Sequence, residues 1–192
     1  MGTAGAGAPT GAGISLASLI AFFRGDRHRS KLLRLIQQSG YLKRCGKNPD
    51  RCDWLTRDRS VVEKYNSDKF CNYIFTVSGY RDLFRMLEEV TDEFWATKVP
   101  TDLPILLISG EDDPVGAYGK GVMHVAGALT HAGERKLTTV LIPGARHEVL
   151  NETDRAETFA LIDKWIAEVL ADPEVLGEDE APEVETFSYE EA

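Results

Sequence analysis

An acidic residue and a histidine stand in two polar segments, each of which follows an apolar run. Segment 109–116 (SGEDDPVG) carries Glu111, Asp112 and Asp113, and segment 143–148 (PGARHE) carries His147. A carboxylate that holds one ring nitrogen of an imidazole fixes its tautomer, so the other nitrogen can take a proton from a hydroxyl. We therefore predict that an acidic residue of the first segment and the histidine of the second can serve as the acid and the base of nucleophilic catalysis.

The serine that such a pair serves usually stands on a G-x-S-x-G turn between a strand and a helix, ahead of the acid in the chain. No G-x-S-x-G occurs in the 192 residues. The nearest segment, 76–80 (TVSGY), lacks the first glycine and opens a predicted helix, where we expect Ser78 to be the N-cap. We therefore predict no nucleophile in this chain.

Both candidate residues have simpler explanations. Asp112 and Asp113 could be acids at a helix N-terminus, where the helix dipole favours them, and His147 could be an ordinary loop residue. A metal site at Glu111, Asp112 and Asp113 would need further ligands, and the sequence offers no cluster that supplies them. We expect no metal and no cofactor. The remaining histidines are expected on solvent-facing surfaces: His28, His124 and His131.

Two strands and two helices would position the pair. Runs 104–108 (PILLI) and 137–142 (LTTVLI) are predicted strands, and 115–132 and 153–171 are predicted helices. A strand-helix-strand-helix order predicts parallel strands with a right-handed crossover. The carboxyl ends of parallel strands meet at one edge of the sheet, so the loops that carry the two candidates should meet there.

The two strands are apolar enough to require further strands beside them and helices on both faces. The helical region that precedes them cannot supply those strands. We therefore expect this chain to be one piece of a larger α/β sheet.

The first half of the chain is predicted to be helical. Apolar spacing predicts helices over 14–24, 30–40, 57–66 and 78–90, with Ser30 and Asp58 as caps of the second and third. We divide the chain into a Gly/Ala-rich loop, a helical cap or lid region, a βαβα part of the core, and an acidic disordered tail. Their boundaries are 1–13, 14–99, 100–171 and 172–192.

The distribution of charge along the chain indicates which kinds of partner it could bind. The net charge of −9 argues against nucleic acid, although residues 24–51 hold nine Arg or Lys against two Asp. The basic, leucine-rich part of this segment is either a solvated helix face or a surface that contacts anionic lipid. No apolar run is long enough to cross a membrane. Three cysteines without paired spacing indicate reduced thiols and a cytoplasmic protein.

Aromatic residues gather in the loops of the cap region. They either line an apolar substrate pocket or pack the cap onto the sheet. The candidates for the pocket are Trp54, Phe70, Tyr73 and Phe75.

Several of these segments together resemble a known family. Segments 107–116 (LISGEDDPVG) and 142–152 (IPGARHEVLNE) resemble the closing part of bacterial monoacylglycerol-lipase-like α/β-hydrolases, also described as lysophospholipases or S33-type serine aminopeptidases. Segments 53–58 (DWLTRD) and 75–83 (FTVSGYRDL) resemble the cap of that family. The resemblance runs from about Gly2 to Leu170.

The resemblance implies a partial α/β-hydrolase fold, with a helical cap followed by the last strand-helix-strand-helix of a parallel sheet and with the N-terminal half missing. It implies that Asp113 is the triad acid and His147 the base, and that the serine and the oxyanion hole belong to the missing half. The expected substrate is a small lipid-like carboxylic ester, such as a monoacylglycerol or a lysophospholipid. The alternative is a catalytically inactive remnant, or an interaction module completed by another chain.

Overall fold

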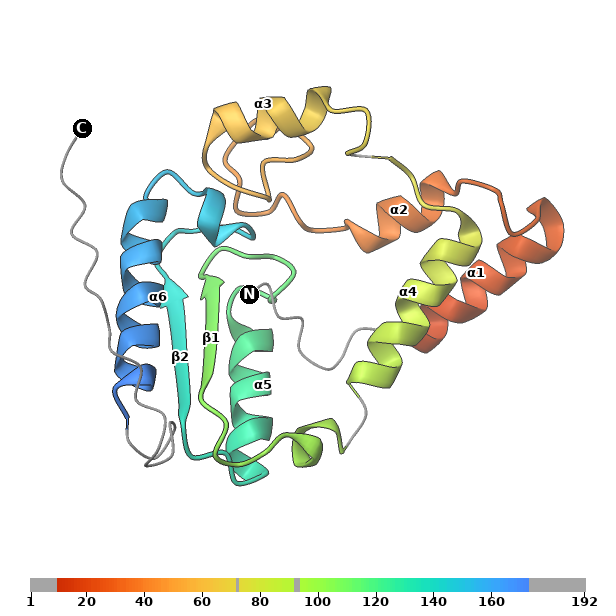
Figure 1. Ribbon diagram of the computed structural model, residues 1–192. Helices are drawn as coiled ribbons and strands as arrows, with labels where there is room; N and C mark the ends of the chain where they lie inside the picture. Colours follow the sequence, from red (N-terminus) through yellow and green to blue (C-terminus); the bar gives the residue numbers. More distant parts are fainter. Residues whose placement is uncertain (1–9, 72, 92–93, 173–192) are drawn as a thin grey trace. The chain divides into compact units, whose positions relative to one another are not determined.

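The computed structural model of the chain describes residues 10–71, 73–91 and 94–172 (Figure 1). The chain divides into two compact units, residues 1–155 and 156–192. Most of the predicted Gly/Ala-rich loop and almost all of the predicted acidic tail lie outside the described residues.

A two-stranded parallel sheet stands in the first unit. Strands β1 (Ile105–Gly110) and β2 (Leu137–Ile142) pair along their whole length. Helix α5 (Lys120–His131) connects them and contacts both (Figure 1). The predicted parallel pairing is confirmed, and both strands end at the same edge of the sheet.

The strands are less buried than their apolar sequences predict. Ile108, Ser109 and Gly110 are buried, but the first half of β1 is only partly buried, and Thr138 on β2 is exposed. The described residues place two strands in the sheet, so each strand has one long edge without a strand partner among them. Such edges agree with the expectation that these strands require further strands beside them.

The loop after β1 is longer than predicted. We expected a helix from residue 115, but α5 begins at Lys120. Ala117 and Tyr118 have φ of 50° and 58°, and Gly119 has φ of 86°, a left-handed conformation that cannot continue into a right-handed helix. The interpretation of Asp112 and Asp113 as acids at a helix N-terminus is therefore wrong.

Two long helices pack side by side in the cap region (Figure 1). They are α1 (Thr10–Arg24) and α4 (Val77–Val90). A Cβ added to Gly13 would lie 2.8 Å from the ring of Phe84, so this glycine lets the two helices approach closely. The contact with α4 offsets the low helix propensity of glycine, and α1 begins four residues before the predicted start. Ala17 of α1 and Val77 and Tyr80 of α4 form a buried core together with Leu33, which lies outside the pair.

Helices α2 (Lys31–Gln37) and α3 (Arg59–Ser67) start where the sequence predicts. The Ser30 hydroxyl accepts a hydrogen bond from the Leu33 amide at 3.2 Å, and Asp58 accepts from the Ser60 amide at 3.0 Å. Both predicted caps are confirmed.

The predicted cap of α4 is wrong. Thr76, not Ser78, has extended backbone and accepts from the Gly79 amide at 3.1 Å. Ser78 is the second residue of the helix, and its hydroxyl lies 3.0 Å from that of Thr76. A threonine two residues earlier thus takes the position that we assigned to the serine.

Short 3-10 helices occupy Trp95–Lys98 (η1) and Val149–Asn151 (η2). Helix α6 (Arg155–Leu170) makes up most of the described part of the second unit, although its first residue is the last of the first unit. Lys164 and Glu168 form an ion pair at 3.8 Å along its surface. Among the described residues, no helix combines the length and the apolar character that a bilayer crossing requires.

Candidate active site

Asp113 lies in the loop that follows β1. Its side chain is fully buried. The backbone amide of Val115 donates to Oδ1 at 2.8 Å, and the hydroxyl of Ser109 donates to Oδ2 at 3.4 Å. The carboxylate is therefore held by groups of strand β1 and of the loop that follows it.

His147 lies in the loop that follows β2 and is about a quarter exposed. Its Nδ1 lies 3.1 Å from Oδ1 and 3.1 Å from Oδ2 of Asp113. The structure thus brings the two predicted site residues into direct contact. Since Nδ1 faces the carboxylate, Nε2 is the ring nitrogen that remains for other chemistry.

Gly110, the last residue of β1, allows the two loops to meet. A Cβ at Gly110 would overlap the carbonyl oxygens of Ala145 and Arg146. The Asp112 amide donates to the Ala145 carbonyl at 2.8 Å, and this bond joins the loops directly. A residue larger than glycine at position 110 would push them apart.

Segment 53–57 covers the histidine loop from the other side. The amide of His147 donates to the Trp54 carbonyl at 3.3 Å, and the Glu148 amide donates to the Leu55 carbonyl at 2.7 Å. The Trp54 ring centroid lies 5.1 Å from that of the imidazole. The imidazole therefore lies between a carboxylate and an indole ring.

A second buried carboxylate stands five residues after the histidine. Glu152 is fully buried, and its Oε1 accepts from the Arg146 amide at 2.7 Å. Its Oε2 accepts from Arg57 twice, from the amide at 3.1 Å and from Nε at 2.9 Å. Arg57 also donates from Nη2 to Asp154 at 2.6 Å, which lowers the pKa of Asp154 below its ordinary value.

Sequence reasoning missed Glu152 and Arg57 as parts of the site. Both stand in segments that we used for the family resemblance, IPGARHEVLNE and DWLTRD. The sequence signal that could have indicated the contact was the presence of opposite charges, Glu152 and Arg57, in these two segments. Their 95-residue separation hid the contact, because the sequence does not reveal which loops meet.

The four predicted pocket residues line a single cavity of about 350 Å³. Tyr73 and Phe75 meet edge to face, with their ring centroids 5.3 Å apart. Trp54 borders this cavity as well as the imidazole, and it also borders a second cavity of about 570 Å³. Both cavities therefore reach the side chain that covers His147. The residues of the first cavity that we predicted are Trp54, Phe70, Tyr73 and Phe75.

The cysteine thiols, and any cluster of possible metal ligands, are the other candidates for chemistry among the described residues. Burial raises the pKa of the Cys45 and Cys52 thiols, so both stay protonated and weakly nucleophilic near neutral pH. In residues 10–71, 73–91 and 94–172, no group of three or more His, Cys, Asp or Glu side chains is arranged to hold a metal ion.

The sequence matches a family model described as serine aminopeptidase, S33, over residues 10–154. Comparison with curated proteins gives no significant match.

Solved structures of similar fold include several hydrolases. A thermostable carboxyl esterase from Bacillus coagulans, solved with glycerol, superposes with a TM-score of 0.72 at 27% identity, over 88% of this chain and 54% of that one. A lipase in an open form gives 0.73 at 22% identity, over 87% and 55%. A monoacylglycerol lipase from Paleococcus ferrophilus gives 0.52 at 16% identity, over 85% and 55%.

This chain therefore spans about half the length of the solved structures that it matches. The helices of residues 10–90, followed by a parallel two-stranded sheet, correspond to part of an α/β-hydrolase fold.

Proposed function

The chain belongs to the S33 serine aminopeptidase family, and on that premise we propose that it carries the acid and the base of an α/β-hydrolase that cleaves carboxylic esters. The contact of Nδ1 of His147 with both carboxylate oxygens of Asp113 carries the proposal. Asp113 is fully buried, so its hydrogen bonds to the imidazole are shielded from water.

In the proposed reaction, Asp113 accepts the Nδ1–H of His147 and keeps Nε2 unprotonated. Nε2 takes the proton of a serine hydroxyl as the serine oxygen attacks the ester carbonyl. The imidazolium then returns that proton to the departing alcohol, and an acyl-serine remains. A water molecule, deprotonated by the same Nε2, releases the carboxylic acid and regenerates the serine.

We assign the serine to sequence outside these 192 residues, because G-x-S-x-G does not occur among them. The isolated chain is then inactive. A catalytically inactive remnant, or an interaction module completed by another chain, is the alternative, and the same missing motif supports it.

The proposed substrate is an ester with one acyl chain, such as a monoacylglycerol or a lysophospholipid. The cavity of about 350 Å³ beside Trp54 has aromatic side chains that an acyl chain could contact, although Arg34, Gln37 and Gln38 also line it. One solved structure of similar fold is a monoacylglycerol lipase. We also propose the division into a cap (14–99) and a core part (100–171). The cytoplasmic location is proposed as well, and it rests on the three free thiols.

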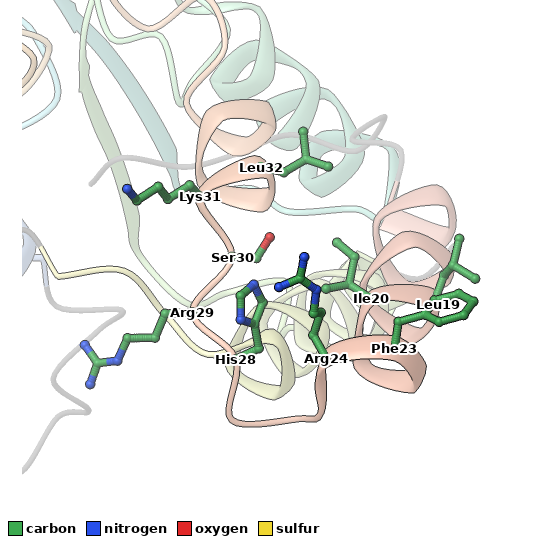
Figure 2. Close-up of a pocket in the computed structure, with 9 residues that line it drawn as sticks. All are labelled: Leu19, Ile20, Phe23, Arg24, His28, Arg29, Ser30, Lys31 and Leu32. Carbon is green, nitrogen blue, oxygen red and sulfur yellow. The ribbon is translucent and has the colours of Figure 1, made fainter.

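We further propose that the cap region contacts an anionic lipid surface. A cavity of about 550 Å³ between α1 and α2 has mostly apolar walls; Arg24 lies beside it, whereas the side chains of Arg29 and Lys31 extend away from Leu19 and Phe23 (Figure 2). Phe23 is 72% exposed and Leu19 is 56% exposed, although both are large and apolar. Apolar side chains beside cations are typical of helices that bind negatively charged membranes. The basic residues at the cavity are Arg24, Arg29 and Lys31.

Vesicle sedimentation tests the lipid contact. The chain should sediment with vesicles of phosphatidylglycerol more than with vesicles of phosphatidylcholine, and Phe23→Ser should reduce the bound fraction several-fold. Met123→Ser is the control, because Met123 is 54% exposed but lies on α5, away from this cavity. Equal binding to both vesicle types, or equal loss in both variants, would refute the contact.

Hydrolysis of a p-nitrophenyl ester tests the catalytic proposal. The protein to assay is the product of the longest open reading frame that contains these residues. His147→Ala should reduce the rate by about 10³-fold or more, while His124→Ala, at an exposed position on α5, should leave it unchanged. Activity that survives His147→Ala would remove this residue from the mechanism.

A fluorophosphonate probe tests the assignment of the serine. The 192-residue chain should not be labelled, whereas the longer product should be labelled at a serine outside it. Labelling of the isolated chain would place an activated serine within it and contradict the assignment.

A further inference from the structure

We infer that Glu152 is a positioning residue for His147. Together with Arg57, it fastens the loop of the base to the cap segment 53–57, and this keeps the imidazole against Asp113. The inference rests on the proposed role of His147 and adds a residue to that site.

The side chain of Glu152 is enclosed and fully engaged. It is 0% exposed and bonds to both segments that surround the imidazole. Oε1 accepts from the Arg146 amide, directly before His147, and Oε2 accepts from the amide and the Nε of Arg57. The Thr153 amide adds a longer bond to Oε2 at 3.3 Å.

The two segments that Glu152 joins also contact each other around the imidazole. The guanidinium of Arg146 donates to the Asp53 carbonyl at 2.6 Å and to the Thr56 carbonyl at 3.1 Å. The His147 amide donates to the Trp54 carbonyl at 3.3 Å. Hydrogen bonds therefore join the backbone on both sides of the imidazole to segment 53–57. Glu152 contributes to this link because it binds both Arg146 and Arg57.

The chemistry requires a carboxylate at this position. Two acceptor oxygens serve donors from two segments, and the guanidinium of Arg57 compensates the buried negative charge. A glutamine of the same shape would present an NH₂ group to one of these donors. Glu152→Gln therefore keeps the volume of the side chain but removes the acceptor for either the Arg146 amide or Arg57.

Asp113 alone does not determine where the imidazole stands. Its carboxylate contacts Nδ1, whereas the position of the ring also depends on the backbone from which it projects. With the link broken, we expect the histidine loop to sample further conformations and the Nδ1–H form of His147 to become less populated.

Long-range ¹H–¹⁵N NMR of the intact 192-residue chain tests this inference. Ring ¹⁵N shifts report which nitrogen carries the proton, and spectra are compared at a pH where these shifts show a neutral ring; His147→Ala assigns the signal. The wild type should show a single form with Nδ1 protonated. In Glu152→Gln a second, Nε2–H form should appear beside it, or the signal should split.

Glu134→Gln is the matched control. Glu134 is also buried and accepts from a backbone amide, that of Lys136, at 2.8 Å. It stands before β2, at the end of the strand opposite the histidine loop. The imidazole signal in this variant should match the wild type, although the protein loses a buried carboxylate there as well.

Asp113→Asn separates this inference from the proposed function. A changed imidazole signal in Asp113→Asn with an unchanged one in Glu152→Gln would overturn the inference and leave the proposed pair intact. An unchanged signal in Asp113→Asn would refute the pair itself. If Glu152→Gln fails to fold, the same NMR measurement on Arg57→Lys tests the inference. This variant keeps the positive charge but loses the hydrogen bond from Arg57 Nε to Glu152. A wild-type signal in Arg57→Lys would then overturn the inference.

Discussion

The loops after β1 and β2 end at the same edge of the sheet, and each contains a fully buried carboxylate with different partners. In the first loop, Asp113 faces an imidazole, one backbone amide and the hydroxyl of Ser109. In the second, Glu152 faces a guanidinium and three backbone amides.

This difference in partners distinguishes a carboxylate that stabilises the fold, Glu152, from one that suits catalysis, Asp113. Burying a carboxylate is costly unless its partners compensate the charge. Glu152 has a permanent cation and a full set of donors, so it holds the fold in place. Asp113 has no permanent cation among these contacts, and it therefore suits the stabilisation of an imidazolium that forms and disappears.

The two loops also differ in how they attach to the cap region. The loop after β1 contacts it through Arg44, which pairs with Asp112 at 2.8 Å, and through the Tyr118 hydroxyl, which donates to the Gly40 carbonyl at 3.0 Å. Arg44 is about half exposed. The loop after β2 is attached through buried Glu152. We therefore expect the second attachment to contribute more to stability.

The largest stability effect should come from Glu152→Ala. Removing this carboxylate leaves the Arg57 guanidinium and the Arg146 amide without a buried partner. We expect the free energy of unfolding to fall by about 3 kcal/mol in chemical denaturation. A loss below about 1 kcal/mol would show that Glu152 is no anchor.

Gly110→Ala should have the next largest effect. The new methyl group would overlap the carbonyl oxygens of Ala145 and Arg146, so we expect a loss of about 1 to 3 kcal/mol. Gly127→Ala is the control on α5, where an added Cβ meets no atom within 4 Å. It should stabilise the protein by about 0.5 to 1 kcal/mol. A Gly110→Ala variant as stable as the wild type would contradict the close approach of the loops.

Arg44→Ala should cost less than about 1 kcal/mol, because exposed ion pairs contribute little. The same denaturation experiment measures it. A loss equal to that of Glu152→Ala would remove the distinction between the two attachments.

The smallest effect should be a pH dependence at Asp154. The Arg57 hydrogen bond lowers the pKa of Asp154 in the folded state below its ordinary value of 3.8. The resulting stability is present above about pH 4 and is lost as the pH falls through the lowered pKa. Asp154→Asn should therefore be less stable than the wild type at pH 6, and this difference should shrink on acidification. A constant difference would exclude this contribution.

Much of the fold could be predicted from the sequence. Apolar runs and turn residues located β1 and β2, and the alternation of strands and helices gave their parallel pairing. The start of α5 could not be predicted, because the left-handed backbone of Ala117 and Tyr118 depends on tertiary contacts rather than on residue type. The early start of α1 depends in the same way on the packing of Gly13 against Phe84.

The contact of Asp113 with His147 followed from strand order, since both residues come directly after parallel strands. Glu152 and Arg57 could not be found in this way, because their contact joins two loops 95 residues apart and follows no periodicity. The link between the cap and the histidine loop is therefore visible only in the structure.

Ester hydrolysis by Asp113→Asn, in the product of the longest open reading frame, tests the central claim most directly. The amide keeps the shape of the side chain but cannot hold the imidazole with Nδ1 protonated and stabilise its cation. We predict a loss of about 10³- to 10⁴-fold in kcat, with little change in KM. A rate within about two-fold of the wild type would contradict the account.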